Sequence, residues 1–299
     1  MKRSWILAVT VLVVVGTAWP GWAADYARPE LIISTEELAG ILTNPEIRIL
    51  DARGADDYKA GHIPGAISLP SPKTQYVERG VPGVLAPVEK LEGLFGELGI
   101  KPTDTLILYD DIVGEPVTRL FWTFDVLGHA KVRVLNGGMS KWAKEGRPIS
   151  KDVPSLAPAK YTAKPDWTKF ADAAYVLVNL QNPQVGLVDD RGPKEWSGEV
   201  ASRQVKRAGR IPGAKNVDWE WNLTTVEGVK VLKGADELAK LYEGAGATKD
   251  KEIIVYCRTG MRSSHAYLAL KLLGYPKVRN YDASMIEWGN RPELPMEKQ

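Results

Sequence analysis

The most restrictive feature of this sequence is an internal duplication. Four short segments recur in the same order in the two halves of the chain: Ile49–Arg53 and Leu187–Arg191, Gly61–Ala66 and Gly209–Ala214, Leu106–Asp110 and Ile253–Cys257, Met139–Trp142 and Met285–Trp288. In each half, short apolar strands alternate with amphipathic helices, which is typical of a parallel sheet. The repeat therefore predicts two α/β domains of the same design.

A proline-spaced stretch joins the two copies, with Pro154, Pro158 and Pro165 along it. Such spacing predicts a semi-rigid linker that runs over the surface. We therefore expect a first domain over residues 25–150, a linker over 151–165 and a second domain over 166–299.

Residues 1–24 are typical of a secretory signal. Lys2 and Arg3 precede an apolar run, and a small residue, Ala23, stands where cleavage is expected. We expect the mature protein to be exported to the periplasm. The alternative is an uncleaved segment that anchors the N-terminus in the membrane, because this stretch carries no further charge.

Charge and cysteine content exclude several classes of function. The chain has 39 basic and 37 acidic side chains, a balance that argues against a nucleic-acid partner. The single cysteine excludes an internal disulfide and the multi-cysteine metal and haem patterns. His62, His129 and His265 are scattered, so no metal site is expected. We expect no cofactor.

The only cysteine, Cys257, stands where an apolar strand ends and a short glycine-containing loop begins. An apolar repeat then predicts a helix, which Gly274 ends. Backbone N–H groups and the helix dipole point at such a loop, and Arg258 and Arg262 add two cations. These surroundings favour the nucleophilic thiolate and the binding of a small anion. The alternative is that Cys257 is an inert buried side chain.

The segment Cys257–Arg262 resembles the active-site loop of rhodanese-type sulfurtransferases, in which a cysteine opens a six-residue loop. The related dual-specificity phosphatases need an arginine one residue later, where this chain has Ser263. The shorter loop favours a sulfur atom over a phosphate group. The resemblance covers nearly all of residues 28–295. It implies two tandem rhodanese-like domains, each a mostly parallel sheet flanked by helices.

The resemblance also implies roles for individual residues. Cys257 would be the catalytic residue, and substrate would be bound by Arg258, Thr259, Gly260, Met261 and Arg262. Arg191 would hold the substrate's anionic group. The alternative for Arg191 is a structural salt bridge to Asp189, since Arg53 occupies the same place in the first copy.

The first copy lacks the nucleophile. Asp110 stands in the place of the cysteine and Asp111 follows it, so the loop is acidic and would repel an anion. We predict a catalytically inactive first domain that packs against the active one. The alternative is a paired-carboxylate or cation site. His265 lies eight residues after Cys257, and we assign it a structural role.

The resemblance implies an enzyme that moves a sulfane sulfur from thiosulfate, or a related small anionic donor, to a thiol or cyanide acceptor. The intermediate would be a persulfide on Cys257. The two loop arginines favour thiosulfate; the alternatives are a 3-mercaptopyruvate sulfurtransferase and a non-catalytic binding module of an exported complex. We expect no membrane contact beyond the signal segment.

Overall fold

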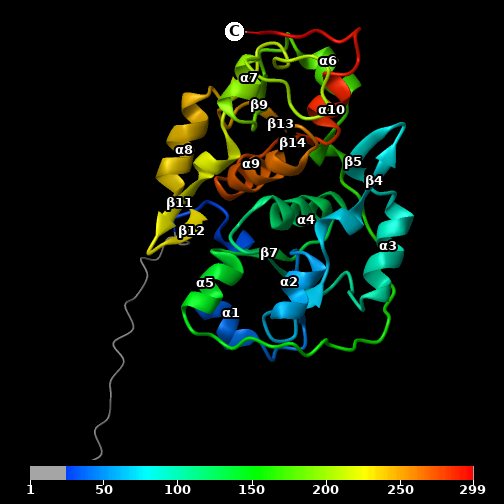
Figure 1. Cartoon of the computed structure of the whole chain (residues 1–299), viewed down its shortest axis with the longest axis vertical. Coiled ribbons are helices and arrows are strands. Elements are labelled where there is room, and N and C mark those ends of the chain that lie inside the picture. Colours follow the sequence, from blue (N-terminus) through cyan, green and yellow to red (C-terminus); the bar gives the residue numbers. More distant parts are fainter. Residues whose placement is uncertain (1–24, 299) are drawn as a thin grey trace, which may run out of the picture.

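The computed structural model describes residues 25–298. The expected signal segment, residues 1–24, lies outside the described residues. Figure 1 shows two α/β units, one built from the first half of the sequence and one from the second. Among residues 25–298, no helix has the length and apolar character needed to cross a membrane.

The first unit is a five-stranded parallel sheet in the order β1-β7-β6-β2-β3, flanked by helices, with a separate hairpin, β4–β5. Its elements are η1 (Pro29–Leu31), β1 (Ile32–Ile33), α1 (Thr35–Ile41), β2 (Ile47–Asp51), α2 (Ala55–Ala60), β3 (Ile67–Ser68), η2 (Ser71–Thr74), β4 (Gln75–Glu78), β5 (Val81–Leu85), α3 (Val88–Glu97), β6 (Thr105–Tyr109), α4 (Glu115–Val126), β7 (Val132–Leu135) and α5 (Gly138–Lys144).

The second unit repeats this plan with a parallel sheet in the order β10-β9-β13-β14-β8 and a hairpin, β11–β12. Its elements are η3 (Trp167–Lys169), β8 (Phe170–Ala171), α6 (Ala173–Asn179), β9 (Val185–Asp189), α7 (Pro193–Ser197), β10 (Lys215–Asn216), η4 (Trp219–Asn222), β11 (Leu223–Val226), β12 (Val229–Leu232), α8 (Ala235–Gly244), β13 (Glu252–Tyr256), α9 (Met261–Leu272), β14 (Val278–Tyr281) and α10 (Ser284–Trp288).

The two sheets have the same topology when read from opposite edges, which confirms the predicted pair of α/β domains. In each sheet the central strands are apolar and buried on both faces, as parallel strands covered by helices must be. The copies also end alike: Ser150 forms a bridge with His62, and Glu297 forms the equivalent bridge with Arg210. His62 is buried, stacks on Tyr58 and contacts two backbone carbonyls, which is a structural role.

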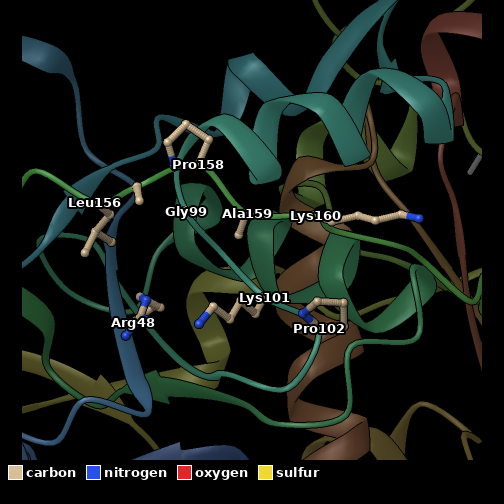
Figure 2. A pocket seen from close by; sticks show the side chains of 9 residues that line it. Arg48, Gly99, Lys101, Pro102, Leu156, Pro158, Ala159 and Lys160 are labelled. Carbon is tan, nitrogen blue, oxygen red and sulfur yellow. The ribbon is translucent and has the colours of Figure 1, made fainter.

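Residues 151–166 form no helix or strand. Part of this stretch borders a hollow of about 570 Å³ on the first domain. Figure 2 shows Arg48, Lys101 and Lys160 among the side chains that line it. Arg48 is paired there with Asp104 at 3.3 Å. None of its lining residues belongs to the loop around Cys257.

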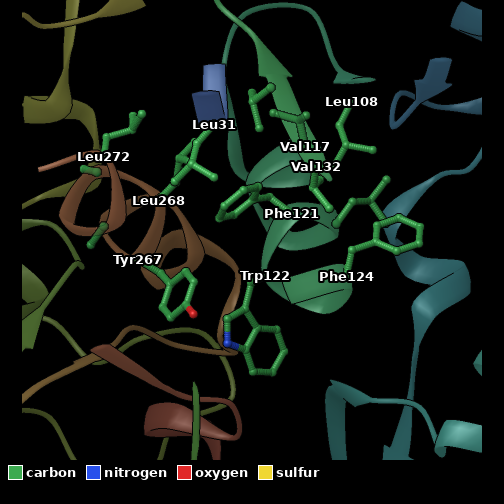
Figure 3. Packing of buried hydrophobic residues seen from close by; sticks show 14 of the residues in the cluster. Leu31, Leu108, Val117, Phe121, Trp122, Phe124, Val132, Tyr267, Leu268 and Leu272 are labelled. Atoms are coloured by element: carbon green, nitrogen blue, oxygen red, sulfur yellow. The ribbon is translucent and has the colours of Figure 1, made fainter. Parts of the chain in front are cut away.

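The domains meet along α4 and α9, which lie side by side in Figure 1. Figure 3 shows Phe121 and Trp122 of α4 near Tyr267 and Leu268 of α9. One cluster of buried apolar side chains is continuous across this contact. Because most of α9 is buried, its sequence lacks the polar face of a surface helix. The domains therefore share a core.

A buried ion pair crosses the same contact. Arg119 of α4 lies 2.6 Å from the carboxylate of Asp282, and both side chains are at most 1% exposed. Arg119 also donates to the carbonyl oxygens of Gly260 and Gly83, and Asp282 accepts the backbone N–H of Leu85 at 2.7 Å. The pair thus joins α4, the β4–β5 hairpin and the segment that follows β14.

A buried histidine makes a second polar contact between the domains. His265 Nε2 lies 2.8 Å from the carbonyl oxygen of Val113, and Asn222 Nδ2 donates to its Nδ1. With Nδ1 accepting, Nε2 carries the proton and donates to Val113. Burial lowers the pKa of His265 to about 4, so the ring is neutral in the folded protein at neutral pH.

We predict that Arg119→Met destabilises the protein by about 3–5 kcal/mol, because the Asp282 carboxylate would remain buried without its counter-charge. Urea unfolding monitored by tryptophan fluorescence measures this change. The matched control is Arg28→Met, since Arg28 and its partner Glu30 are both exposed and such a pair contributes little. Equal, small effects of the two substitutions would contradict the prediction.

We also predict an acid-dependent loss of stability that depends on His265. Its pKa is lowered in the folded state, so the unfolded chain binds the proton more tightly, and stability falls as the pH drops below about 6.5. Near pH 4.5 the loss from this residue should approach about 2–3 kcal/mol. Urea unfolding across this pH range measures the free energy of unfolding. This energy should depend less on pH in His265→Gln, which keeps a neutral N–H donor, than in the wild type. Parallel profiles would contradict the prediction.

Candidate active site

Cys257 directly follows β13 and is 1% exposed. The loop after it is shorter than the sequence suggested, since α9 begins at Met261 and the predicted loop residues Met261 and Arg262 belong to its first turn. Gly260 makes this possible with a φ of 71°. A side chain at Gly260 would lie 2.6 Å from the carbonyl oxygen of Asp282, so the close approach requires glycine.

A serine after β14 holds the two ends of this loop. The Ser284 hydroxyl oxygen accepts the backbone N–H groups of Cys257 and Gly260, each at 3.1 Å. Its own proton is donated to the carbonyl oxygen of Tyr281. The first copy has Gly138 in the matching position, and both residues have a positive φ. A serine in a place that favours glycine was the available sequence signal, and our sequence analysis missed it.

The remaining N–H groups of the loop have no acceptor within the described part of the chain. They belong to Arg258, Thr259, Met261 and Arg262. Met261 and Arg262 present theirs at the start of α9, where the helix dipole is positive. These four donors have no acceptor of their own in the described chain, and the cradle for a small anion stays a prediction from the sequence.

Polar side chains behind the loop orient the first turn of α9. Ser263 Oγ lies 3.5 Å from Cys257 Sγ and 2.7 Å from Asn280 Oδ1. Asn280 Nδ2 donates to the carbonyl oxygen of Gly260 and to Ser264 Oγ. The Ser263 hydroxyl can thus donate to Asn280 or to the sulfur, with the shorter contact to Asn280. No sequence pattern had singled out Asn280.

The two loop arginines differ in their surroundings. Arg262 forms a salt bridge with Glu195 at 2.6 Å, with both side chains mostly buried. Burial opposes ionisation of Glu195, but hydrogen bonds from Arg262 and Ser202 outweigh it and lower its pKa. Within residues 25–298, Arg258 has no carboxylate within ion-pairing distance. Arg258 is therefore the loop cation whose charge is available to a ligand.

The first domain adds a carboxylate near these arginines. Burial raises the pKa of Glu115, the first residue of α4, and the positive charges of Arg262 and Arg258 act in the opposite direction. The β4–β5 hairpin also reaches the loop: Gln75 Nε2 contacts Met261 Sδ at 3.1 Å. Gly83 faces Thr259 closely enough that an added side chain would touch it. The first domain therefore forms one wall of the candidate site.

The structure places Arg191 in a buried ion pair. Its side chain is 1% exposed and pairs with Asp189 at 2.6 Å, while further N–H groups donate to Ser202 and to the carbonyl oxygen of Gly209. Arg53 and Asp51 form the same pair in the first domain. The arrangement recurs beside a loop that has no nucleophile, which favours the structural alternative for Arg191.

The loop of the first domain holds its own anion. The Asp110 carboxylate accepts the backbone N–H groups of Ile112, Gly114 and Val117. Burial nevertheless raises the pKa of Asp110 to about 6. Asp111 is exposed and lies 3.6 Å from Arg53, so the adjacent carboxylates face different partners and do not form a paired site. The cradle that could bind an anion is occupied by the chain itself.

His265 does not contact Cys257. Both ring nitrogens are engaged, one by Asn222 and one by Val113, which fits the structural role assigned to it.

Comparison with known proteins agrees with this geometry. The model of the rhodanese-like domain matches residues 34–145 and again residues 172–291. A thiosulfate sulfurtransferase from Azotobacter vinelandii is 36% identical over 273 residues, covering 91% of this chain and 99% of the relative. The sulfur carrier protein TtuD from Thermus thermophilus is 38% identical over 287 residues, covering 91% and 98%.

Solved structures of EanB resemble the whole two-domain chain. A variant of EanB with a cysteine persulfide, in complex with ergothioneine, has a TM-score of 0.82 and 25% identity, covering 93% of this chain and 74% of that one. The anaerobic ergothioneine biosynthesis enzyme from Chlorobium limicola has a TM-score of 0.81 and 26% identity, covering 91% and 71%. With two matched domains and relatives similar over nearly their full length, this chain belongs to the rhodanese family and is a sulfurtransferase.

Proposed function

We propose that this protein transfers a sulfane sulfur from thiosulfate, or a closely related anion, to a thiophilic acceptor through a persulfide on Cys257. The observation that carries the proposal is the position of Cys257 at the base of a loop whose backbone N–H groups lack acceptors in the described chain. Relatives named as thiosulfate sulfurtransferases support the choice of donor.

The first step is a displacement at sulfur. The Cys257 thiolate attacks the outer sulfur of thiosulfate, the new S–S bond forms, and the old one breaks with its electron pair leaving on sulfite. The negative charge then rests on the outer sulfur of the persulfide. The N–H groups of Arg258, Thr259, Met261 and Arg262 are placed to stabilise this charge.

The second step returns the thiolate. A thiol or cyanide attacks the outer sulfur, and the Cys257 sulfur leaves with the electron pair of the S–S bond. The acceptor binds only after sulfite has gone, so the kinetics should be of the ping-pong type. No cofactor enters either step.

The charge argument for thiosulfate rests on one arginine rather than two. The positive charge of Arg262 is compensated by the ion pair with Glu195. No carboxylate of the described residues pairs with Arg258, so its charge can act on the ligand. Thiosulfate is a compact dianion with its charge close to the attacked sulfur. In 3-mercaptopyruvate the negative charge lies on the carboxylate, which is farther from the sulfur. Arg258 next to the nucleophile therefore favours thiosulfate.

Export to the periplasm is also a proposal. Its support is the basic start and apolar run within residues 1–24. Fractionation of cells that express the full chain, with N-terminal sequencing of the product, tests it. Recovery of an uncleaved chain in the membrane fraction would favour an anchor instead.

We predict that Cys257→Ser abolishes sulfur transfer, because the chain has no second cysteine to replace the nucleophile. Intact mass after incubation with thiosulfate should show one added sulfur on the wild type and none on the variant. An unchanged urea unfolding curve is the control for the fold. A wild type that gains no sulfur would favour the non-catalytic binding module, and turnover by the variant would refute the mechanism.

We predict a higher kcat/KM for thiosulfate than for 3-mercaptopyruvate. Arg258→Gly should narrow the ratio by about tenfold or more, since one charge-assisted contact contributes roughly 1.5–3 kcal/mol. Arg79→Gly is a matched control, because Arg79 is exposed on the hairpin of the first domain and already has a φ of 48°. Steady-state kinetics with both donors measures this ratio of kcat/KM values. A wild-type preference for mercaptopyruvate would refute the charge argument.

A further inference from the structure

A second carboxylic acid lies beside the nucleophile. In the parallel ladder of β9 and β13, Asp189 pairs with Tyr256. The next residues, Asp190 and Cys257, continue this register, because the Asp190 N–H donates to the carbonyl oxygen of Tyr256 at 2.9 Å. Side chains at paired positions of neighbouring strands project from the same face of the sheet. The Asp190 carboxyl and the Cys257 sulfur are therefore neighbours at its carboxyl edge.

The Asp190 carboxyl group is buried without a hydrogen-bond partner in the described residues. Asp190 is 0% exposed, and neither of its oxygens has a hydrogen-bond partner within residues 25–298. In contrast, the carboxylate of Asp189 is paired with Arg191. A lone carboxylate in such a place is costly, and the usual response of the group is to keep its proton.

The groups around Asp190 act in the same direction. Burial, followed by the negative charges of Cys257 and Asp189, raises the pKa of Asp190 well above its usual range. Asp218 adds to this effect, and Arg262 opposes it only in part, because it is paired with Glu195. Tyr242 also lies near Asp190, but it donates its proton to Asn222.

In the first domain the carboxyl group stands on the loop, at the position equivalent to Cys257, and not on the adjacent strand. There Ala52 stands in the place of Asp190, and Asp110 in the place of Cys257. The Asp110 carboxylate is held by three backbone N–H groups of its loop. In the second domain the loop position carries sulfur, and the carboxyl group stands on the adjacent strand, out of reach of such donors. The loop N–H groups thus favour the anion on the sulfur.

We propose that Asp190 is a positioning residue that holds the one proton shared with Cys257, so that the sulfur rests as a thiolate beside a neutral carboxylic acid. The proton leaves Cys257 Sγ, a bond forms to an Asp190 oxygen, and the electron pair of the S–H bond stays on sulfur. The two groups then carry a single negative charge, which rests on sulfur. No external base is needed.

The consequence for sulfur transfer rests on the proposed function. During attack on thiosulfate the proton stays on Asp190, and sulfite leaves with its electron pair. A neutral Asp190 adds no negative charge next to the dianion or the persulfide, whereas an ionised one would repel both. The rate of persulfide formation should therefore fall at alkaline pH, when Asp190 loses its proton.

The direct test does not depend on sulfur transfer. The infrared difference spectrum of wild type minus Asp190→Asn should show the carbonyl band of a protonated carboxylic acid at neutral pH, and lose it at alkaline pH. Glu220→Gln is the control, since Glu220 is an exposed acidic side chain. A carboxylate signal from Asp190 at neutral pH would overturn the proposal.

A second test follows the reactivity of the single cysteine. Asp190→Ala, which copies the first domain, should react with iodoacetamide about tenfold more slowly than wild type at neutral pH, because the group that takes up the proton of Cys257 is lost. Asp190→Asn also cannot take up a proton and should be slowed to a similar extent. In the wild type alone, anionic iodoacetate should lose rate relative to iodoacetamide at alkaline pH.

The outcomes separate the two proposals. Faster alkylation of both Asp190 variants than of wild type would show that Asp190 normally holds the negative charge, and would refute its assignment. A protonated Asp190 and the expected order of alkylation, together with no sulfur gained from thiosulfate, would refute the proposed function while leaving the role of Asp190 intact.

Discussion

The catalytic loop of this protein depends on a buried charge that belongs to the other domain. Arg119 reaches across from α4, pairs with Asp282 and donates to the carbonyl oxygen of Gly260, the residue at which the loop turns into α9. Trp122 packs beneath the guanidinium, 4.4 Å from its centre. Since a buried ion is tolerated only with its partner in place, the domains and the loop are held in one arrangement. The loop geometry is therefore a property of the two-domain unit.

This dependence explains why the chain keeps a domain without a nucleophile. The first domain places Arg119 under the loop, Glu115 near its cations and the carbonyl oxygen of Val113 against His265. Its own loop is closed, because Asp110 occupies the N–H groups that an anion would need. The N–H groups of this loop are occupied by the chain, whereas four of those in the second loop have no acceptor in the described residues. The duplication thus yields a support and a site from one fold.

The sequence was sufficient for what depends on local order along the chain. The repeat predicted two parallel sheets, and the position of Cys257 between a strand and a helix was correct. It was insufficient where a contact joins distant segments. The pairing of Arg262 with Glu195 spans 67 residues, and no local pattern distinguishes it from a free cation. The sequence also could not show that Arg191 is buried in an ion pair with Asp189, as Arg53 is with Asp51.

These contacts change how the site must select an anion. Glu195 cancels Arg262, Glu115 lies near the same cations, and a neutral Asp190 would add no charge, so the site is not simply a region of positive potential. What remains is Arg258 and a set of backbone N–H groups with fixed directions. Backbone donors stabilise charge only where they point. Selection then depends on how close the ligand's charge lies to the atom under attack, which distinguishes sulfur transfer from general anion binding.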